Sequence, residues 1–360
     1  DNDFYFKIIN THINILIVLI FYKSLRVTFD EINKNNLIIL STIIFVMPSF
    51  RAYSIWPDSF MFGFIFFLLS IYFYINFKNK KSNIKKKKFA LYNTLSLIIA
   101  AYISPNYGVF VIFFLYSFLK EFKFSRYFIY ILVLNFLLSV PFFYYIFFLE
   151  NNFLDFDGST WVKGVTTLSI NNLANKVILL PTIFIVFFLP FVVLKFEYFL
   201  SKMKKILKRF SLMHLFIMAS PFLLLPFFSY EKVKLNLGGG GIFYNFFYFF
   251  EDQIFLLSII SSVSIFLILL FFYKSDSKYL DNNEKYLFII SLILTSPQLT
   301  TYIMYYELIL FTGIFLFFEK KIMNEIIGDY KKIYFIIFYY MLFLGLNLLK
   351  FKFLGILEKY

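Results

Sequence analysis

Long runs of apolar residues alternate with short polar segments along the whole chain. Several runs reach the roughly 20 residues that a helix needs to cross about 30 Å of hydrocarbon at about 1.5 Å per residue. Four runs are shorter and border Pro48, Pro105 or Pro297, as kinked or half-inserted segments do. The pattern predicts an all-α polytopic transmembrane helix bundle of about twelve spans, at residues 4–22, 37–50, 59–77, 89–103, 107–119, 127–149, 177–194, 211–229, 254–273, 286–296, 302–318 and 333–349.

The composition excludes a water-soluble globular protein. Hydrophobic residues make up 61% of the chain and charged residues 16%, whereas soluble domains carry about 25% charged and about 45–50% apolar residues. We therefore expect residues 1–360 to form a single integral membrane domain. The chain has no Cys, and its two histidines are His12 and His214. We accordingly expect no disulfide, no metal site and no cofactor.

Lys and Arg residues gather in every second segment between the predicted spans. Of the 35 Lys and Arg residues behind the net charge of +14, 26 lie in alternate inter-span segments, at 23–36, 78–88, 120–126, 195–210, 274–285 and 319–332. Cytoplasmic loops of membrane proteins carry such an excess. The pattern therefore indicates a multi-pass protein in contact with membrane lipids and argues against nucleic acid as a partner. For the run from Lys78 to Lys88 we expect a solvated loop with some contact to anionic lipid.

The same topology places residues 1–7 outside the cytoplasm. The chain begins Asp1-Asn2-Asp3 without Met or a signal peptide. We therefore expect an N-terminally truncated fragment whose first span is missing. The two sizeable external loops are predicted at 150–176 and 230–253.

A few polar residues stand inside or at the edge of predicted spans, near the external face. Arg51 and Asp58 lie in PSFRAYSIWPDSFMFG, and Asn106 and Tyr107 lie in the turn ISPNYGVF. Glu307 lies inside its span in TTYIMYYELILF. An ionisable group in hydrocarbon is costly unless it is paired or faces water. We therefore expect Glu307 to have a partner such as Arg51 and a functional role.

Several of these segments resemble those of multi-pass glycosyltransferases of the GT-C type. FRAYSIWPDSFMFGFIFFLLSIYF is similar to the Arg-x-x-x-Ile-Trp-Pro-(x)-Asp region of enzymes that use polyprenyl-phosphate sugars. More distantly, it is similar to the alpha-1,2-glucosyltransferase of the lipid-linked oligosaccharide pathway. SPNYGVFVIFF, LGGGGIFYNF and TSPQLTTYIMYYELILF add further likeness in a plausible order. The chain departs from the pattern in lacking a basic residue before Asn106 and a Pro after Glu307.

The resemblance implies inverting sugar transfer from a polyprenyl-phosphate donor to a glycan, lipid or protein acceptor at the extracytoplasmic face. In such enzymes a carboxylate in the first external loop is the general base, so the resemblance implies that the base lies in the missing N-terminal loop. The catalytic candidates in this chain are Asp58 and Glu307. The resemblance implies that Arg51 binds the donor phosphate, and that the other substrate-binding residues are Asn106, Tyr107 and Tyr306.

Two other classes of protein remain open. A polytopic transporter or lipid-linked sugar flippase has the same composition, although it usually shows internal repeats, and we find none. A polysaccharide polymerase or ligase usually has a large external loop rich in Arg and His, whereas the longest predicted external loop has neither. The predicted location is a bacterial inner (cytoplasmic) membrane.

Overall fold

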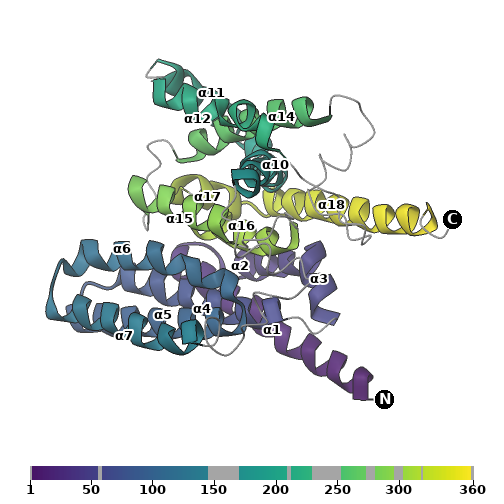
Figure 1. Cartoon of the computed structure of the whole chain (residues 1–360). Coiled ribbons are helices and arrows are strands. Elements are labelled where there is room, and N and C mark those ends of the chain that lie inside the picture. The colour runs from purple at the N-terminus through teal and green to yellow at the C-terminus, as the bar shows by residue number, and fades with distance from the viewer. Residues whose placement is uncertain are drawn as a thin grey trace. The chain divides into compact units, whose positions relative to one another are not determined.

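The computed structural model describes residues 2–55, 59–144, 170–208, 212–228, 253–272, 280–295, 303–317 and 319–357 (Figure 1). Every regular element within these residues is a helix, and the described part of the chain contains no strand, so the predicted all-α class is confirmed. The chain divides into two compact units. Each unit is described by itself.

The first unit draws its residues from Asp1–Phe45, Phe50–Val162 and Ser277–Thr295. Within it α4 packs along both α1 and α5, and α15 packs on α6 and on the short helix η2. Helix α3 begins with two residues that belong to the second unit. The elements are α1 (Asn2–Thr28), α2 (Lys34–Ser41), η1 (Thr42–Val46), α3 (Pro48–Ile55), α4 (Ser59–Asn79), α5 (Asn83–Ile103), η2 (Pro105–Phe110), α6 (Val111–Phe122), α7 (Arg126–Tyr144) and α15 (Asn282–Leu294).

The second unit draws its residues from Val46–Ser49, Lys163–Asp276 and Ser296–Tyr360. Helix α10 is its centre, because α10 contacts α11, α12, α14, α16 and α18. The elements are α10 (Ile170–Leu194), α11 (Phe196–Leu207), α12 (Leu212–Leu223), η4 (Leu225–Phe227), α14 (Gln253–Phe272), α16 (Ile303–Phe317), α17 (Lys320–Ile327) and α18 (Tyr330–Leu357).

The number of long apolar helices is smaller than the predicted number of spans. Four helical segments of the described chain are long and apolar enough to cross a membrane, at Lys7–Thr28, Phe60–Asn79, Leu173–Leu194 and Ile254–Phe271. A fifth is reached if α11 and α12, which are bent by 110° with respect to each other, count as one broken span. The other predicted spans also contain helix, but several are short. Helix α6, for example, has 12 residues and is about 18 Å long, which is less than the hydrocarbon thickness of about 30 Å.

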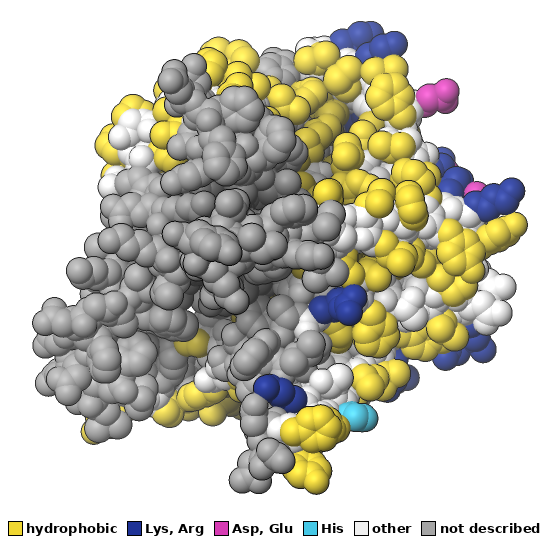
Figure 2. Space-filling view, turned by 90° about the vertical axis from the view of Figure 1, so that its right-hand side faces the viewer, with side chains coloured by type: hydrophobic (Ala, Val, Ile, Leu, Met, Phe, Trp, Pro, Cys, Tyr) yellow, Lys and Arg dark blue, Asp and Glu magenta, His cyan; other side chains and the backbone are white. Residues whose placement is uncertain are grey.

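Many large apolar side chains face outward. Phe136 on α7 is 68% exposed and Phe216 on α12 is 68% exposed, and α1 and α18 carry similar residues. Figure 2 shows hydrophobic side chains spread over much of the described surface on the face that it draws. Soluble monomers rarely expose apolar surface on this scale. Together with the four long apolar helices, this surface is that of an all-helical membrane protein.

Two of the predicted basic loops contain amphipathic helices. The loop 195–210 contains α11, which buries Phe199 and Ile206, and the loop 319–332 contains α17, which buries Ile322 and Ile326. Phe199 and Ile206 are seven positions apart and Ile322 and Ile326 are four apart, so each pair lies on one helix face. The predicted external loops 150–176 and 230–253 lie mainly outside the described residues, and α10 already begins at Ile170.

The close packing of α4 against η2 depends on a glycine. The Tyr107 ring is fully buried and stacks between Phe60 and Phe67, with ring centroids 5.2 and 4.9 Å away. Its hydroxyl donates to the Phe60 carbonyl oxygen at 3.1 Å. A Cβ atom at Gly63 would lie 2.8 Å from Cε2 of Tyr107 and 3.1 Å from Cβ of Ser104. Only glycine therefore leaves the ring in this place.

We expect Gly63→Ala to destabilise the protein by about 1–3 kcal/mol, because the trapped ring cannot move away from the new methyl group. The measurement is thermal unfolding of the detergent-solubilised chain. Gly345→Ala is the matched control, since it is also in a helix and a Cβ there would meet nothing within 4 Å. That control is expected to stabilise by about 0.5–1 kcal/mol. Equal effects of the two substitutions would contradict the packing argument.

Candidate functional site: an apolar cavity and a buried carboxyl group

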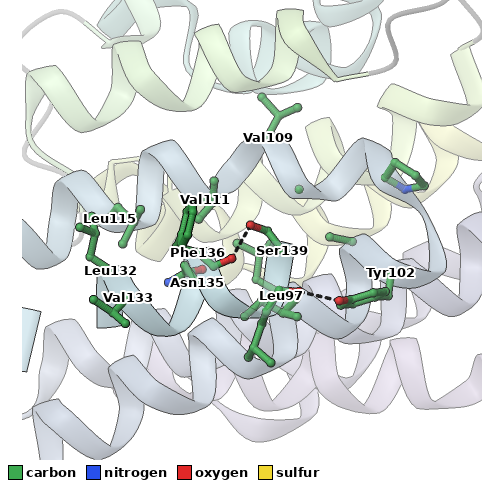
Figure 3. A pocket seen from close by; sticks show the side chains of 15 residues that line it. Leu97, Tyr102, Val109, Val111, Leu115, Leu132, Val133, Asn135, Phe136 and Ser139 are labelled. Carbon is green, nitrogen blue, oxygen red and sulfur yellow. Dashed lines mark hydrogen bonds between the residues drawn. The ribbon is translucent and has the colours of Figure 1, made fainter. Parts of the chain in front are cut away.

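A large cavity lies in the first unit between α5, η2, α6 and α7. Its volume is about 760 Å³, within the range of about 300–1,000 Å³ that is usual for ligand cavities. Figure 3 shows its side chains converging from these helices. Phe136 is 68% exposed and Tyr102 is 47% exposed, so the cavity opens at the outer surface of the unit. The lining residues are Leu97, Ile98, Ala101, Tyr102, Pro105, Gly108, Val109, Val111, Leu115, Leu132, Val133, Asn135, Phe136, Leu138 and Ser139.

The polar side chains of this cavity are already hydrogen-bonded to backbone carbonyl groups. The Tyr102 hydroxyl donates to the Leu138 oxygen at 2.5 Å (Figure 3), and the Ser139 hydroxyl donates to the Phe136 oxygen at 2.8 Å. The Asn135 amide donates to the Ile131 oxygen at 2.9 Å. The rest of the lining is hydrocarbon, so the cavity suits an alkyl or isoprenoid chain better than a polar ligand.

The turn with the predicted residues Asn106 and Tyr107 forms one wall of the cavity. This turn is η2, and its residues Pro105, Gly108 and Val109 line the cavity directly. Asn106 is 6% exposed, and Tyr107 is buried in the aromatic stack described above. The structure therefore places both predicted residues beside the cavity but gives Tyr107 a packing role in its wall. Their predicted contact with substrate stays a prediction.

A buried carboxyl group lies in the second unit. Glu307, in the apolar helix α16, is fully buried. Its Oε2 atom accepts a hydrogen bond from the Ser49 backbone N–H at 3.1 Å and another from the Ser49 hydroxyl. Its Oε1 atom is also buried and has no hydrogen-bond partner among the described residues. An unpaired buried oxygen costs free energy, and a role in chemistry is one reason why a protein keeps such a group.

The surroundings of Glu307 are apolar. Tyr306, the predicted substrate-binding neighbour, is fully buried, as are Leu308 and Phe311. The ring of Tyr340 on α18 lies 5.7 Å from that of Phe311, and the Tyr340 hydroxyl donates to the Phe187 oxygen at 2.8 Å. The described side chains next to Glu307 in its helix are thus buried and largely apolar.

Of the other two residues predicted at the external face, Arg51 is described by the structure and Asp58 is not. Arg51 is exposed on α3 and belongs to the first unit, whereas Glu307 belongs to the second. Their pairing stays a prediction, and the partner that the structure gives to Glu307 is Ser49. Asp58 lies outside the described residues.

A second buried carboxylate, Glu284 of the first unit, was not among the residues predicted from the sequence. Its side chain is 1% exposed and accepts hydrogen bonds from Lys78 on α4 and Ser117 on α6. The Tyr74 hydroxyl lies 2.9 Å from the Ser117 hydroxyl and extends this network. Glu284 also closes the capping box of α15 with Asp281. The sequence Asp-Asn-Asn-Glu at residues 281–284, before an apolar run, is a sequence signature of such a capping box.

An exposed ion pair continues the network outward. Lys120 at the end of α6 donates to Asp281, and this hydrogen bond raises the pKa of Lys120. All these side chains lie where predicted cytoplasmic segments meet the helix ends. We assign the network a structural role, which is to hold α4, α6 and α15 together.

No group of three or more His, Asp or Glu side chains that could hold a metal ion occurs among the described residues. Comparison with protein families, curated proteins and solved structures gives no match. The class that the fold and surface define is an all-helical membrane protein. The similarity to GT-C glycosyltransferases stays a prediction, carried by the motifs alone.

Proposed function

We propose that this protein is a multi-pass membrane glycosyltransferase that uses a polyprenyl-phosphate-linked sugar as donor. The acceptor is a glycan, a lipid or a protein at the extracytoplasmic face of a bacterial inner membrane. The observation that carries the proposal is the hydrocarbon-lined cavity of the first unit, which offers a donor's isoprenoid chain a place among the helices. The buried carboxyl group and the quoted motifs support the sugar chemistry.

The proposed reaction is a single displacement at the anomeric carbon. The acceptor oxygen bonds to this carbon as the bond from the carbon to the phosphate oxygen breaks, and polyprenyl phosphate leaves. A carboxylate takes the acceptor's proton, and Asp58 and Glu307 are the candidates for this role in the given chain. Arg51 would stabilise the charge on the leaving phosphate, and Asn106, Tyr107 and Tyr306 would position the substrates.

The cavity gives the sharpest test of this proposal. Val133 lines the cavity on α7, whereas Leu137, one turn further along, is 58% exposed and does not line it. We expect Val133→Trp to raise the KM for an undecaprenyl-phosphate sugar by about tenfold or more, because the indole occupies the space of the chain. Leu137→Trp is expected to leave KM unchanged. Equal KM values for the two variants would contradict a chain-binding role for the cavity.

Substitution of Arg51 tests whether this residue stabilises the phosphate group of the donor. We expect Arg51→Ala to lower kcat/KM by about 10²-fold or more, since the guanidinium would stabilise the leaving group. Arg51→Lys should recover only part of the loss, because Lys cannot contact phosphate bidentately. Arg26→Ala, an exposed arginine of a predicted cytoplasmic segment, is the control and should keep full activity. Normal transfer by Arg51→Ala would remove Arg51 from the site.

The second candidate function is a transporter or flippase for a lipid-linked sugar. One observation favours it: Lys176 is 5% exposed within α10 and makes no hydrogen bond or ion pair among the described residues. Ionisable groups inside membrane helices often mark a transport path. Reconstituted vesicles separate the two functions, since a flippase moves the labelled lipid-linked sugar between leaflets without consuming it. A transferase releases polyprenyl phosphate.

A further inference from the structure

A second cavity, unrelated to the apolar one, lies in the first unit where α5 begins and where the chain turns from α6 into α7. Its volume is about 480 Å³. The turn is tight, because Lys123 ends α6 with a positive φ of 50°. Ser125 then starts α7 by accepting a hydrogen bond from the Phe128 N–H. These two helix ends form a basic pocket, lined in part by Lys81, Lys86, Lys87, Glu121, Arg126 and Tyr127.

The charges of the basic pocket are unbalanced. It holds four cationic side chains and one carboxylate, Glu121, which accepts a hydrogen bond from Lys86. The Lys87 ammonium lies 5.3 Å from the centre of the Tyr127 ring. Lys81 and Arg126 are exposed, and within the described chain neither makes an ion pair. Two cations of the pocket are therefore available to a ligand.

The helix ends at the basic pocket also favour an anion. Helix N-termini carry a partial positive charge and usually have acidic residues in the first turn. The first turns of α5 and α7 contain no acidic residue. That of α5 instead continues into four consecutive lysines, Lys85 to Lys88. The two positive helix ends add to the four cations. Against them stand Glu121 and the negative C-terminal end of α6, so positive charge is in excess and favours a bound anion.

The rim of the basic pocket indicates where the anion comes from. Ile84 follows the lining residue Asn83, and Phe124 precedes the lining residue Ser125. Each of the two apolar side chains is 80% exposed. Large apolar side chains beside basic residues are typical of segments that dip into the interface of a membrane. The positive-inside pattern places the same segments at the cytoplasmic surface, which is rich in anionic lipid.

We propose that the basic pocket binds the phosphate group of an anionic phospholipid, with Lys81 and Arg126 as the contacting cations and Ile84 and Phe124 in the acyl-chain boundary. The chemistry is that of a phosphate anion. The adjoining apolar residues make a lipid headgroup, rather than a soluble phosphate, its source. The proposal is independent of the proposed sugar transfer, because it concerns the opposite predicted face of the membrane.

The experiment compares ligands and variants on the full chain purified in detergent. The probes are short-chain phosphatidylglycerol, short-chain phosphatidylcholine and inorganic phosphate, and binding is followed by native mass spectrometry and by the shift in Tm. The test variant is the double substitution Lys81→Gln and Arg126→Gln. The control is Lys85→Gln with Lys88→Gln, which removes the same charge from exposed lysines of α5 that do not line the pocket.

We expect phosphatidylglycerol to bind about tenfold or more tightly than phosphatidylcholine, a preference that the test variant loses and the control variant keeps. An equal loss in both variants would mean general attraction to a basic surface and would overturn the proposal. So would an unchanged preference in the test variant. Binding of inorganic phosphate as strong as that of phosphatidylglycerol would overturn the lipid as the source.

Discussion

Glu307→Gln is expected to lower sugar transfer by about 10²–10⁴-fold while the protein keeps or gains stability. The loss is the usual contribution of a carboxylate that accepts a proton in the transition state. The amide retains an oxygen that accepts the two Ser49 hydrogen bonds. The substitution also replaces a buried ionisable group, whose Oε1 has no hydrogen-bond partner among the described residues, by a neutral amide, so Tm should not fall. The measurements are initial transfer rates in membrane vesicles and thermal unfolding of the same preparation.

The split between activity and stability distinguishes a functional carboxyl group from a structural one. Thr312→Val on the same helix is the control, because Thr312 is also buried and its hydroxyl bonds to the Leu308 oxygen of its own helix. This control should retain transfer. If Glu307→Gln loses stability and activity together, Glu307 is a structural residue. Full activity in Glu307→Gln would remove it from the site.

Glu284→Ala is expected to cause the largest loss of stability, about 3–5 kcal/mol, because it leaves Lys78 partly buried without its partner carboxylate. The Lys78 side chain is 18% exposed, and Ser117 loses its acceptor in the same step. Glu121→Gln is the control, since the Lys86–Glu121 pair is more exposed and its loss should cost less than about 1 kcal/mol. Thermal or denaturant unfolding in detergent gives both values.

A double substitution separates the burial of charge from the loss of contacts. Lys78→Met combined with Glu284→Leu removes both charges and fills the space, so it should recover more than half of the loss of Glu284→Ala. The loss of stability that remains in the double variant would measure the contribution of the Ser117 hydrogen bond and of the capping box. No recovery would mean that the network contributes through geometry and not through charge compensation.

The helices were predictable from the sequence, and the pairing of their side chains was not. Apolar runs bounded by Pro48 and Pro105 fall on breaks between helices, because proline removes a backbone donor. Run length overestimated the number of crossings, since a run such as 107–119 divides into a 3-10 turn and a short helix.

For the candidate site, the sequence identified Glu307 as exceptional because a carboxylate is conspicuous in an apolar helix. It did not indicate the hydrogen bonds from Ser49, because this residue, 258 positions away, is one of many serines and carries no signal of its own. Glu284 was hidden for the opposite reason. It lies in a segment where charge is expected, and only the fold shows that it is buried. The apolar cavity depends on the packing of four elements, so no single run predicts it.

The cavity between α5, η2, α6 and α7 is fixed in shape by Tyr107, which ties η2 to α4 through a contact that only Gly63 permits. In a bilayer we expect a lipid acyl chain to fill this apolar space when no isoprenoid chain occupies it. An isoprenoid chain would then displace another hydrocarbon, and the free energy of this exchange would come from the better fit of the chain to the walls, because lipid tails are as apolar as leucine side chains. Under the proposed function, the cavity would select for the contour of a methyl-branched, unsaturated chain over a straight one.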